Sequence, residues 1–385
     1  MGEEERKGPL SGLKVIEMAG LGPVPLAALI LSEMGATVVR VARLGAAASF
    51  LNLPPELDLD RQGRGTVKVD LKAPEGMALM RELAAGADVL IEGFRPGVME
   101  RLGLGPDELL EANPGLVYGR MTGFGQEGPL AARAGHDLTY LALTGMLHAI
   151  GPKGGKPVPP LNLVADYGGG TMFLIAGILA ALFERSRSGR GQVVDAAMVD
   201  GAATLGSLPY ALLAAGLWHD QRGSNLLDSG APFYDTYETS DGRHIAVACL
   251  EPQFFAEFAR LLPLEERLAR AQYDVSLWPA MREAIAGTVA QRSRDDWWSI
   301  FAETDACVAP VLSMAEAPDH ALNVARGTFR AQGKLRRAAP APRFSRTVSA
   351  PSGPATKNDG MAALAAFGIS TDRAEALARS GVIGG

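Results

Sequence analysis

The first forty residues constrain the fold most, because they read as a strand, a glycine- and proline-rich turn, an apolar helix and a second strand. We expect the strands at residues 13–17 and 37–41 and the helix at residues 26–34. A strand, a crossover helix and a second strand within about thirty residues form a βαβ unit with parallel strands. Because parallel strands are covered by helices on both faces, the chain must contain an α/β domain.

Further β-rich runs extend this pattern through the first half of the chain. Strands are expected at residues 87–94, 115–125 and 192–198, with a helix at residues 97–102. We therefore predict a Rossmann-like large α/β domain with a parallel sheet over residues 1–198.

The pattern of predicted secondary structure changes after residue 230. Two β-rich runs flank Asp241-Gly242, a strong hairpin signal, and helix-like and strand-like segments follow. This pattern predicts a small α+β domain over residues 230–324. An Ala- and Leu-rich helix within residues 199–229 would link the two domains, and residues 325–385 would complete the large one.

Charge and apolar patterning exclude several classes of partner. The 37 Lys and Arg residues against 43 Asp and Glu residues give a net charge of −6, which argues against a nucleic acid or an anionic membrane surface. The longest apolar run, residues 172–183, is too short to span a bilayer and is expected to form a buried helix. Cys249 and Cys307 lack metal-site or disulfide spacing, and no secretory signal is recognised, so we expect a cytoplasmic protein.

The turn after the first strand does not predict a nicotinamide site. Prolines occupy two positions of residues 20–25 and remove amide donors that a dinucleotide loop needs. The second strand instead ends in Arg40 and Arg43, and Arg95 and Arg101 follow a later strand. Arginines at strand ends could hold the phosphates of a ligand, or they could form ordinary solvated surface.

The sharpest chemical pattern is Gly135-His136-Asp137, followed by Asp166 just before the long apolar run. Asp166 could be a simple N-cap, or a base or nucleophile beside the free amides of a helix N-terminus. His136 could equally be structural. Glu251 ends a strand and begins a helix, where an acidic residue is common in any case.

Together these segments resemble the class III CoA-transferase family, and within it its racemase branch. The matching stretches run in order from residue 12 to about residue 312: GLKVIEMAGLGP, DVLIEGFRPGVMERLGLGP, YGRMTGFGQEGP, AGHDLTYLALTG, PPLNLVADYGGG, GRGQVVDAAMVDG, APFYDTYETSDGR, LEPQF and DACVAPVL. The combination of GHD, NLVAD and LEPQF is specific to the racemase branch. The segment over residues 46–60 departs from the family pattern, which concerns the loop over the coenzyme A entrance.

The resemblance implies an enzyme that interconverts (2R)- and (2S)-2-methylacyl-CoA thioesters, an isomerase of lipid metabolism. His136 and Asp166 would be its two bases, Asp137 would support them, and Glu251 of the partner subunit would hold the imidazole. Arg43 and Arg101, assisted by Arg40 and Arg95, would bind the phosphates of coenzyme A.

The resemblance also implies a homodimer whose two chains interlock. Coenzyme A would enter as part of the substrate, and no metal or separate cofactor would be required. Two alternatives stay open at this point: a CoA transferase with Asp166 as nucleophile, and a non-catalytic protein that binds CoA thioesters.

Overall fold

The protein, seen in a computed structural model, is described over residues 8–45, 53–54, 56–354 and 359–384. It divides into two compact units. Unit 1 comprises Met1–Thr144, Leu161–Leu205 and Arg330–Gly385, and unit 2 comprises Gly145–Pro160 and Gly206–Phe329.

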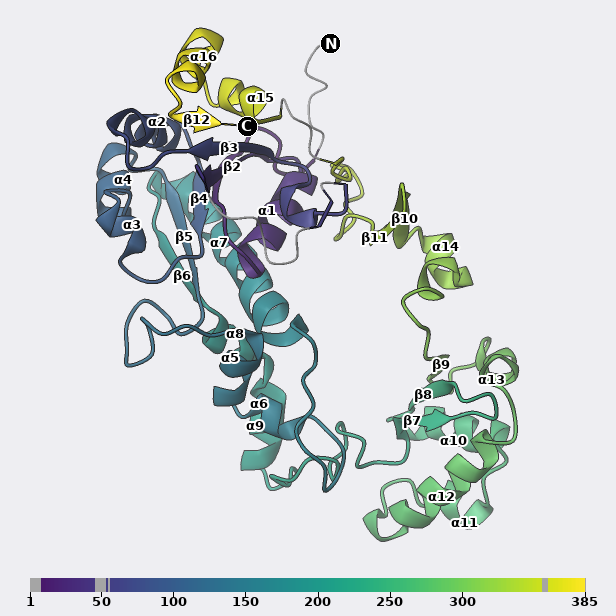
Figure 1. The fold of residues 1–385 in the computed structure, drawn as a ribbon. Helices are drawn as coiled ribbons and strands as arrows, with labels where there is room; N and C mark the ends of the chain where they lie inside the picture. The colour runs from purple at the N-terminus through teal and green to yellow at the C-terminus, as the bar shows by residue number, and fades with distance from the viewer. Residues whose placement is uncertain (1–7, 46–52, 55, 355–358, 385) are drawn as a thin grey trace. The chain divides into compact units, whose positions relative to one another are not determined.

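Unit 1 contains a seven-stranded sheet in the order β12-β3-β2-β1-β4-β5-β6 (Figure 1). Every neighbouring pair is parallel except β12 and β3, which are antiparallel. The strands are β1 (Lys14–Met18), β2 (Thr37–Arg43), β3 (Gly65–Val69), β4 (Val89–Glu92), β5 (Val117–Thr122), β6 (Val193–Ala197) and β12 (Ile383–Gly384). The α/β class with a large, mostly parallel sheet is therefore confirmed.

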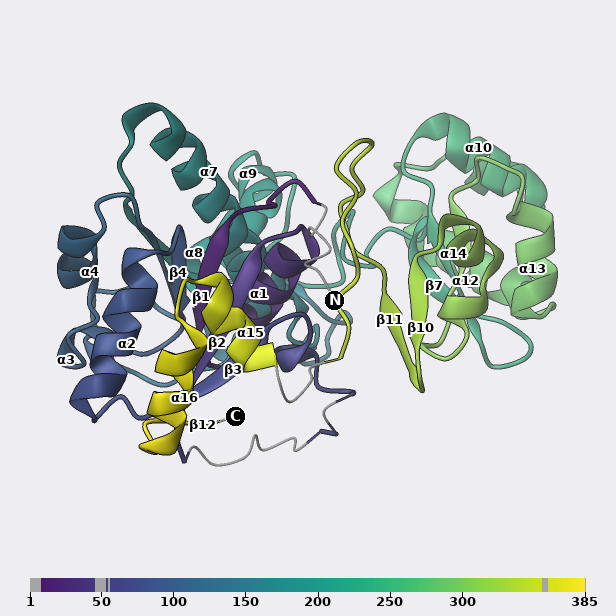
Figure 2. The ribbon, with the colours of Figure 1, turned by 90° about the horizontal axis from the view of Figure 1, so that it is seen from above.

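Helices cover both faces of this sheet (Figures 1 and 2). One face packs against α1 (Pro23–Glu33) and α7 (Met172–Ser188). The other packs against α2 (Pro74–Ala85), α15 (Asp359–Ala366) and α16 (Thr371–Arg379). Both faces are thus apolar, and adjacent β1 residues such as Val15 and Ile16 are each fully buried.

Shorter helical elements of unit 1 connect the strands or follow them. These are η1 (Leu59–Arg61), α3 (Val98–Arg101), α4 (Pro106–Ala112), α5 (Asp137–Leu143), the π-helix η2 (Leu163–Thr171) and α8 (Met198–Leu205). The π-helix runs directly into α7.

The segment at residues 335–354 begins with a strand, β11 (Leu335–Ala338), which pairs with β10 (Phe329–Gln332). Arg337 fastens it to unit 1 through a buried ion pair with Glu33. The same guanidinium donates a hydrogen bond of 2.7 Å to Oε1 of Gln62. Because all three side chains are buried, this segment is fixed to the large unit and is more than a surface linker.

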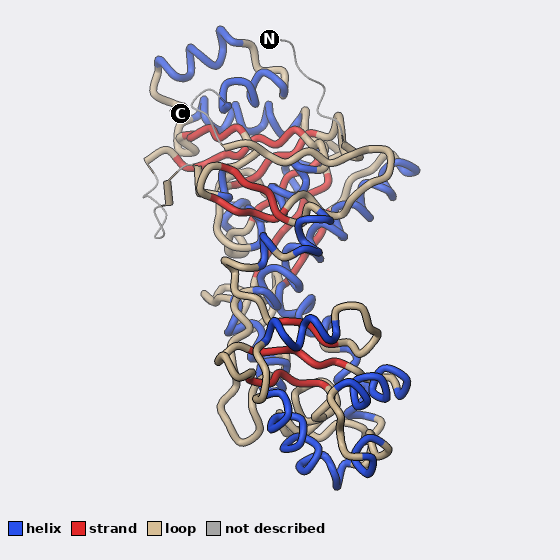
Figure 3. Tube along the Cα trace, turned by 90° about the vertical axis from the view of Figure 1, so that its right-hand side faces the viewer, coloured by secondary structure: helices blue, strands red, loops and turns tan. Residues whose placement is uncertain are grey.

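Unit 2 is built on a three-stranded antiparallel sheet, seen with the larger sheet in red in Figure 3. Its strands are β7 (Tyr234–Glu238), β8 (His244–Ala248) and β9 (Val308–Pro310). Its helices are α6 (Met146–Ala149), α9 (Ser207–Ala214), α10 (Pro252–Leu261), α11 (Glu266–Ala269), η3 (Val275–Leu277), α12 (Trp278–Val289), α13 (Arg294–Phe301), η4 (Ala317–Asp319) and α14 (Ala321–Arg326).

An aromatic core holds unit 2 together. The rings of Phe233 and Phe255 lie 5.5 Å apart, and those of Phe258 and Phe301 lie 5.9 Å apart. These four side chains are at most 2% exposed, and such aromatic pairs contribute beyond their area burial. The expected hairpin turn is present between β7 and β8, where Gly242 takes the positive φ of 72° that favours glycine.

Two sequence expectations about helices differ from the structure. The single linker helix expected within residues 199–229 is two helices, because Gly206 interrupts it between α8 and α9. Residues 215–231 are turns, and buried Asn225 orders them by donating hydrogen bonds to the carbonyls of His219 and Gln221.

The apolar run at residues 172–183 lies in a longer helical segment than predicted. Leu163–Ser188 covers 26 residues and is, by length and composition alone, long and apolar enough to cross a membrane. Its buried residues include Leu174 and Ile178, which contact Gly119 of the central sheet. That packing is typical of a core helix, although the length argument from sequence was wrong.

Candidate active site

The order of strands in unit 1 points to a binding site at the carboxyl ends of β1 and β4. The chain leaves β1 toward β2 on one side and reaches β4 and β5 on the other, so the order reverses between β1 and β4. Open α/β sheets bind ligands at the carboxyl edge of such a switch point. Asp166 lies beside Gly22, which follows β1, and Arg95 follows β4, so both predicted residues belong to this region.

Asp166 lies beside the turn that follows β1. A Cβ placed on Gly22 would stand 3.6 Å from Oδ2 of Asp166, and Gly22 has the positive φ of 73°. Asp166 is not the N-cap that the sequence suggested: it is the fourth residue of the π-helix η2, whose N-cap is Asn162. π-helical turns are rare and often occur at functional sites.

Asp137 fixes the backbone that carries Asp166. Its Oδ2 accepts hydrogen bonds of 2.8 Å from the backbone N–H groups of both Ala165 and Asp166. The Asp137 side chain is buried, at the first position of α5. The sequence predicted free backbone amides beside Asp166, and for the amides of Ala165 and Asp166 this is wrong because both donate to Asp137.

The environment of Asp166 sets its proton affinity. Burial raises the pKa of this carboxyl above its ordinary range, and the neighbouring Asp137 carboxylate raises it further. The Nδ2 of Asn162, 3.5 Å from Oδ2 of Asp166, and the charge of His136 act in the opposite direction. The structure thus brings His136, Asp137 and Asp166 into one electrostatic cluster.

His136 occupies the N-cap position of α5 and is exposed. Its backbone N–H donates a hydrogen bond of 3.0 Å to Oγ1 of Thr139, and its carbonyl accepts one of 2.8 Å from the backbone N–H of Thr139. The backbone is therefore fixed while the imidazole is open to a ligand.

The predicted partner of the imidazole, Glu251, belongs to unit 2. It is exposed at the N-cap position of α10, and its carbonyl accepts a hydrogen bond of 3.0 Å from the backbone N–H of Phe255. A role of Glu251 beside His136 stays a prediction.

The four predicted phosphate-binding arginines differ in how they are held. Arg43 is exposed at the carboxyl end of β2, and Arg101 is exposed at the end of α3. Arg40 is instead mostly buried, with its Nε 3.4 Å from Oε1 of buried Glu17. Glu17 is shared with buried Arg64, whose Nε lies 2.8 Å from Oε2 of Glu17. Because Arg40 is mostly buried against this cluster, it is the least suitable of the three for an exchangeable phosphate.

Sequence reasoning missed two polar neighbours of Asp166. Asn162 precedes it by four residues, and Tyr140 follows Asp137 by three residues on the buried side of α5. The helical spacing from Asp137 to Tyr140 was a usable signal, since residues three apart share a helix face. Arg95, exposed after β4, acts electrostatically on the Tyr140 hydroxyl.

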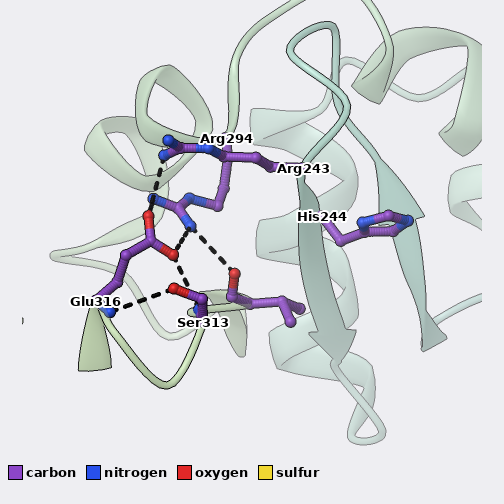
Figure 4. A pocket seen from close by; sticks show the side chains of 6 residues that line it. Arg243, His244, Arg294, Ser313 and Glu316 are labelled. Carbon is purple, nitrogen blue, oxygen red and sulfur yellow. Dashed lines mark hydrogen bonds and ion pairs between the residues drawn. The ribbon is translucent and has the colours of Figure 1, made fainter.

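A pocket of about 480 Å³ in unit 2 contains none of the predicted site residues (Figure 4). Glu316 accepts hydrogen bonds of 3.1 and 3.0 Å from Arg294 and lies 3.2 Å from Arg243. The Arg294 bonds, followed by that from the Ser313 amide, lower the pKa of Glu316 to about 2. Since the charges are satisfied by one another and His244 points away from them, this is a structural ion-pair cluster.

Within the described residues, no group of three or more His, Cys, Asp or Glu side chains is arranged to hold a metal ion. The absence of a metal requirement stays a prediction.

The geometry defines an α/β protein with a large, mostly parallel sheet and an acid–base cluster at its switch point. A sequence profile of CoA-transferase family III matches residues 10–358. The chain belongs to this family, which confirms the predicted resemblance.

The chain is also similar to individual members of this family. The alpha-methylacyl-CoA racemase of Mus musculus is 47% identical over 345 residues, 89% of this chain and 88% of that protein. The alpha-methylacyl-CoA racemase of Homo sapiens is 45% identical over 322 residues, 83% of this chain and 82% of that protein. A crystal structure of a CaiB/BaiF family protein from Brucella suis has a TM-score of 0.80 and 27% identity, covering 94% of this chain and 100% of that one.

Proposed function

We propose that this protein is a racemase that interconverts (2R)- and (2S)-2-methylacyl-CoA thioesters. The observation that carries the proposal is that Asp166, at the sheet's switch point, lies within electrostatic range of His136 and on a backbone held by Asp137, in a chain similar to two racemases. The family name alone would also allow a transferase, and the acid–base residues support the choice of a proton-transfer enzyme.

The reaction removes one proton from C2 of the acyl group and adds one proton to the opposite face of the same carbon. A base removes the proton from C2, and the electron pair of the broken C–H bond forms the C1–C2 double bond of an enolate, with charge on the thioester oxygen. The second group, which is protonated and lies on the opposite face, then gives its proton to C2, and the thioester carbonyl forms again. His136 and Asp166 each serve one face, and no electrons leave the substrate.

Several finer features belong to the same proposal. Coenzyme A takes part as the portion of the thioester substrate that the protein binds, and no further cofactor is required. The protein acts as a homodimer with interlocked chains, in which Glu251 of the partner subunit orients His136. Asp137 is a positioning residue, because it holds the backbone of Asp166.

The direct test is exchange of the α-proton in D2O across a panel of 2-methylacyl-CoA thioesters. We expect deuterium at C2 together with loss of optical purity, starting from either epimer. The panel includes a branched fatty acyl, a sterol side-chain acyl and an arylpropionyl thioester. No exchange with any of them would contradict the proposal.

A CoA transferase is the second candidate, because Asp166 is a carboxylate beside an open turn in a family that includes transferases. In that reaction Asp166 attacks the thioester carbonyl and displaces CoA thiolate, giving a mixed anhydride. Hydroxylamine trapping, or a mass increase on Asp166 with substrate, detects this route. A protein that only binds CoA thioesters would show neither trapping nor exchange.

The exposed arginines give a prediction about substrate binding. Arg43→Ala or Arg101→Ala should weaken binding of a CoA thioester by about 1 to 3 kcal/mol, since each loses a charge-assisted bond to phosphate. Titration calorimetry measures the affinity. The loss should be much smaller for the matching pantetheine thioester, which has no phosphate groups.

The control is Arg270→Ala, which removes an exposed arginine paired with Glu266 in unit 2. It should leave both affinities unchanged. Equal losses for the CoA and pantetheine thioesters in the Arg43 or Arg101 variant would reject the phosphate assignment.

A further inference from the structure

The enolate oxygen of the proposed reaction needs a hydrogen-bond donor, and the amides of Ala165 and Asp166 are already bonded to Asp137. We propose that the phenol of Tyr140 supplies a donor, making Tyr140 a further catalytic residue that binds the thioester oxygen as it becomes an enolate. This inference rests on the proposed racemase function.

The position of Tyr140 follows from the helix that also carries Asp137. Asp137 and Tyr140 are three residues apart on α5, and both are buried, with exposed fractions of 5% and 7%. Residues at this spacing share one face of a helix. The Asp166 carboxylate acts electrostatically on the Tyr140 phenol, so the phenol lies within range of the π-helix.

Two glycines hold the ring in place. A Cβ on Gly123 would lie 2.1 Å from Cε1 of Tyr140 and 2.7 Å from its hydroxyl oxygen. A Cβ on Gly135 would lie 2.5 Å from the same Cε1. Because Gly123 directly follows β5, the hydroxyl lies at the carboxyl edge of the sheet, where the ligand is expected. The ring of Phe124 closes the other side, edge to face at 4.9 Å.

The Tyr140 hydroxyl has no hydrogen-bond partner among the residues the structure describes. The oxygen is not one of the buried unpartnered polar atoms of the described residues, so it reaches the surface of the site although the residue as a whole is buried. A ligand can therefore accept a hydrogen bond from it. Burial and, next, the charge of Asp166 raise the pKa of Tyr140 to about 12, against the opposing charge of Arg95. The phenol therefore keeps its proton over the working pH range and can donate in every turnover.

The test compares Tyr140→Phe with wild type. This variant keeps the ring between the two glycines and removes only the oxygen. We expect kcat for α-proton exchange to fall about 100-fold, the usual cost of removing one oxyanion donor. Affinity for the corresponding CoA thioether, which has no carbonyl oxygen, should not change, and neither should the unfolding temperature.

The matched control is Tyr118→Phe in β5. It removes a buried hydroxyl that donates a hydrogen bond of 2.9 Å to the carbonyl of Leu104 within the apolar core of unit 1. It should lower the unfolding temperature and leave kcat within twofold of wild type, the opposite pattern to Tyr140→Phe.

The outcomes separate this inference from the function on which it rests. Absence of exchange in the wild-type protein contradicts the racemase proposal itself. Exchange in wild type with an unchanged kcat in Tyr140→Phe overturns the role of Tyr140 alone. An equal loss of thioether affinity in that variant also overturns it, because the hydroxyl would then serve general binding.

Discussion

His136→Ala and Asp166→Asn should each abolish racemisation in both directions. Every turnover needs one group to take the proton and the other to return one, so loss of either member interrupts the cycle. A positioned acid or base contributes about 10²- to 10⁴-fold to rate, and we expect losses at the upper end of that range. Circular dichroism or chiral chromatography of the released acid measures racemisation from each epimer.

The two variants should differ in the exchange that remains. In His136→Ala, Asp166 can still remove and return a proton on its own face, and in Asp166→Asn the imidazole can do the same. Deuterium should therefore enter C2 with retained configuration, from opposite epimers in the two variants. Deuterium entry from the same epimer in both would contradict the assignment of one base to each face.

The two-base mechanism also predicts the direction in which kcat/KM changes with pH. Asp166 must be deprotonated when it acts as the base, and burial raises its pKa above the ordinary range of a carboxyl. As pH falls through that raised pKa, kcat/KM should decrease for the epimer whose proton Asp166 removes. Asn162→Ala removes an interaction that opposes this shift, so it should move that decrease to higher pH.

One result would redirect the mechanism as a whole. Near-normal racemisation by His136→Ala would show that the imidazole is not one of the two bases. Asp166 would then be better explained as the nucleophile of a CoA transferase, and covalent trapping on its carboxyl would become the decisive measurement.

The parallel sheet was predictable because strands such as β1, β2 and β4 are apolar on both faces and alternate with glycine-rich turns. β3 was not recognised, since Lys68 and the neighbouring polar residues weaken its pattern. β12 has two residues and owes its place to antiparallel pairing with β3. Such pairing is a tertiary effect that local sequence does not carry.

The candidate site was predicted in its residues but not in its geometry. His136, Asp137 and Asp166 stood out by residue type and by family resemblance. Sequence could not distinguish an N-cap from a π-helical turn, because a polar residue before an apolar helix is typical of both. As a result, the sequence predicted free amides beside Asp166, whereas those of Ala165 and Asp166 are bonded to Asp137.

The position of the π-helix η2, which carries Asp166, depends on close packing against α8. At the contact the two backbones meet with no side chain between them. Gly169 of η2 faces Gly201 of α8, and a Cβ on Gly201 would lie 1.9 Å from the carbonyl oxygen of Gly169. That Cβ would also lie 2.7 Å from the Gly169 Cα. Real Cβ atoms do not approach backbone this closely, so any larger residue must push the two helices apart.

Gly201→Ala should therefore destabilise unit 1 and displace Asp166. Overpacking costs typically about 1 to 3 kcal/mol, and we expect the upper end because the obstacle is backbone. Helix propensity alone would favour alanine by about 1 kcal/mol, so the clash must outweigh a gain.

The control is Gly287→Ala within α12, where nothing lies within 4 Å of the new Cβ, and this variant should be as stable as wild type or more so. Urea unfolding compares the midpoints, and α-proton exchange should fall in the Gly201 variant alone. If both variants have the same midpoint, close backbone contact does not hold the π-helix, and the position of Asp166 must have another cause.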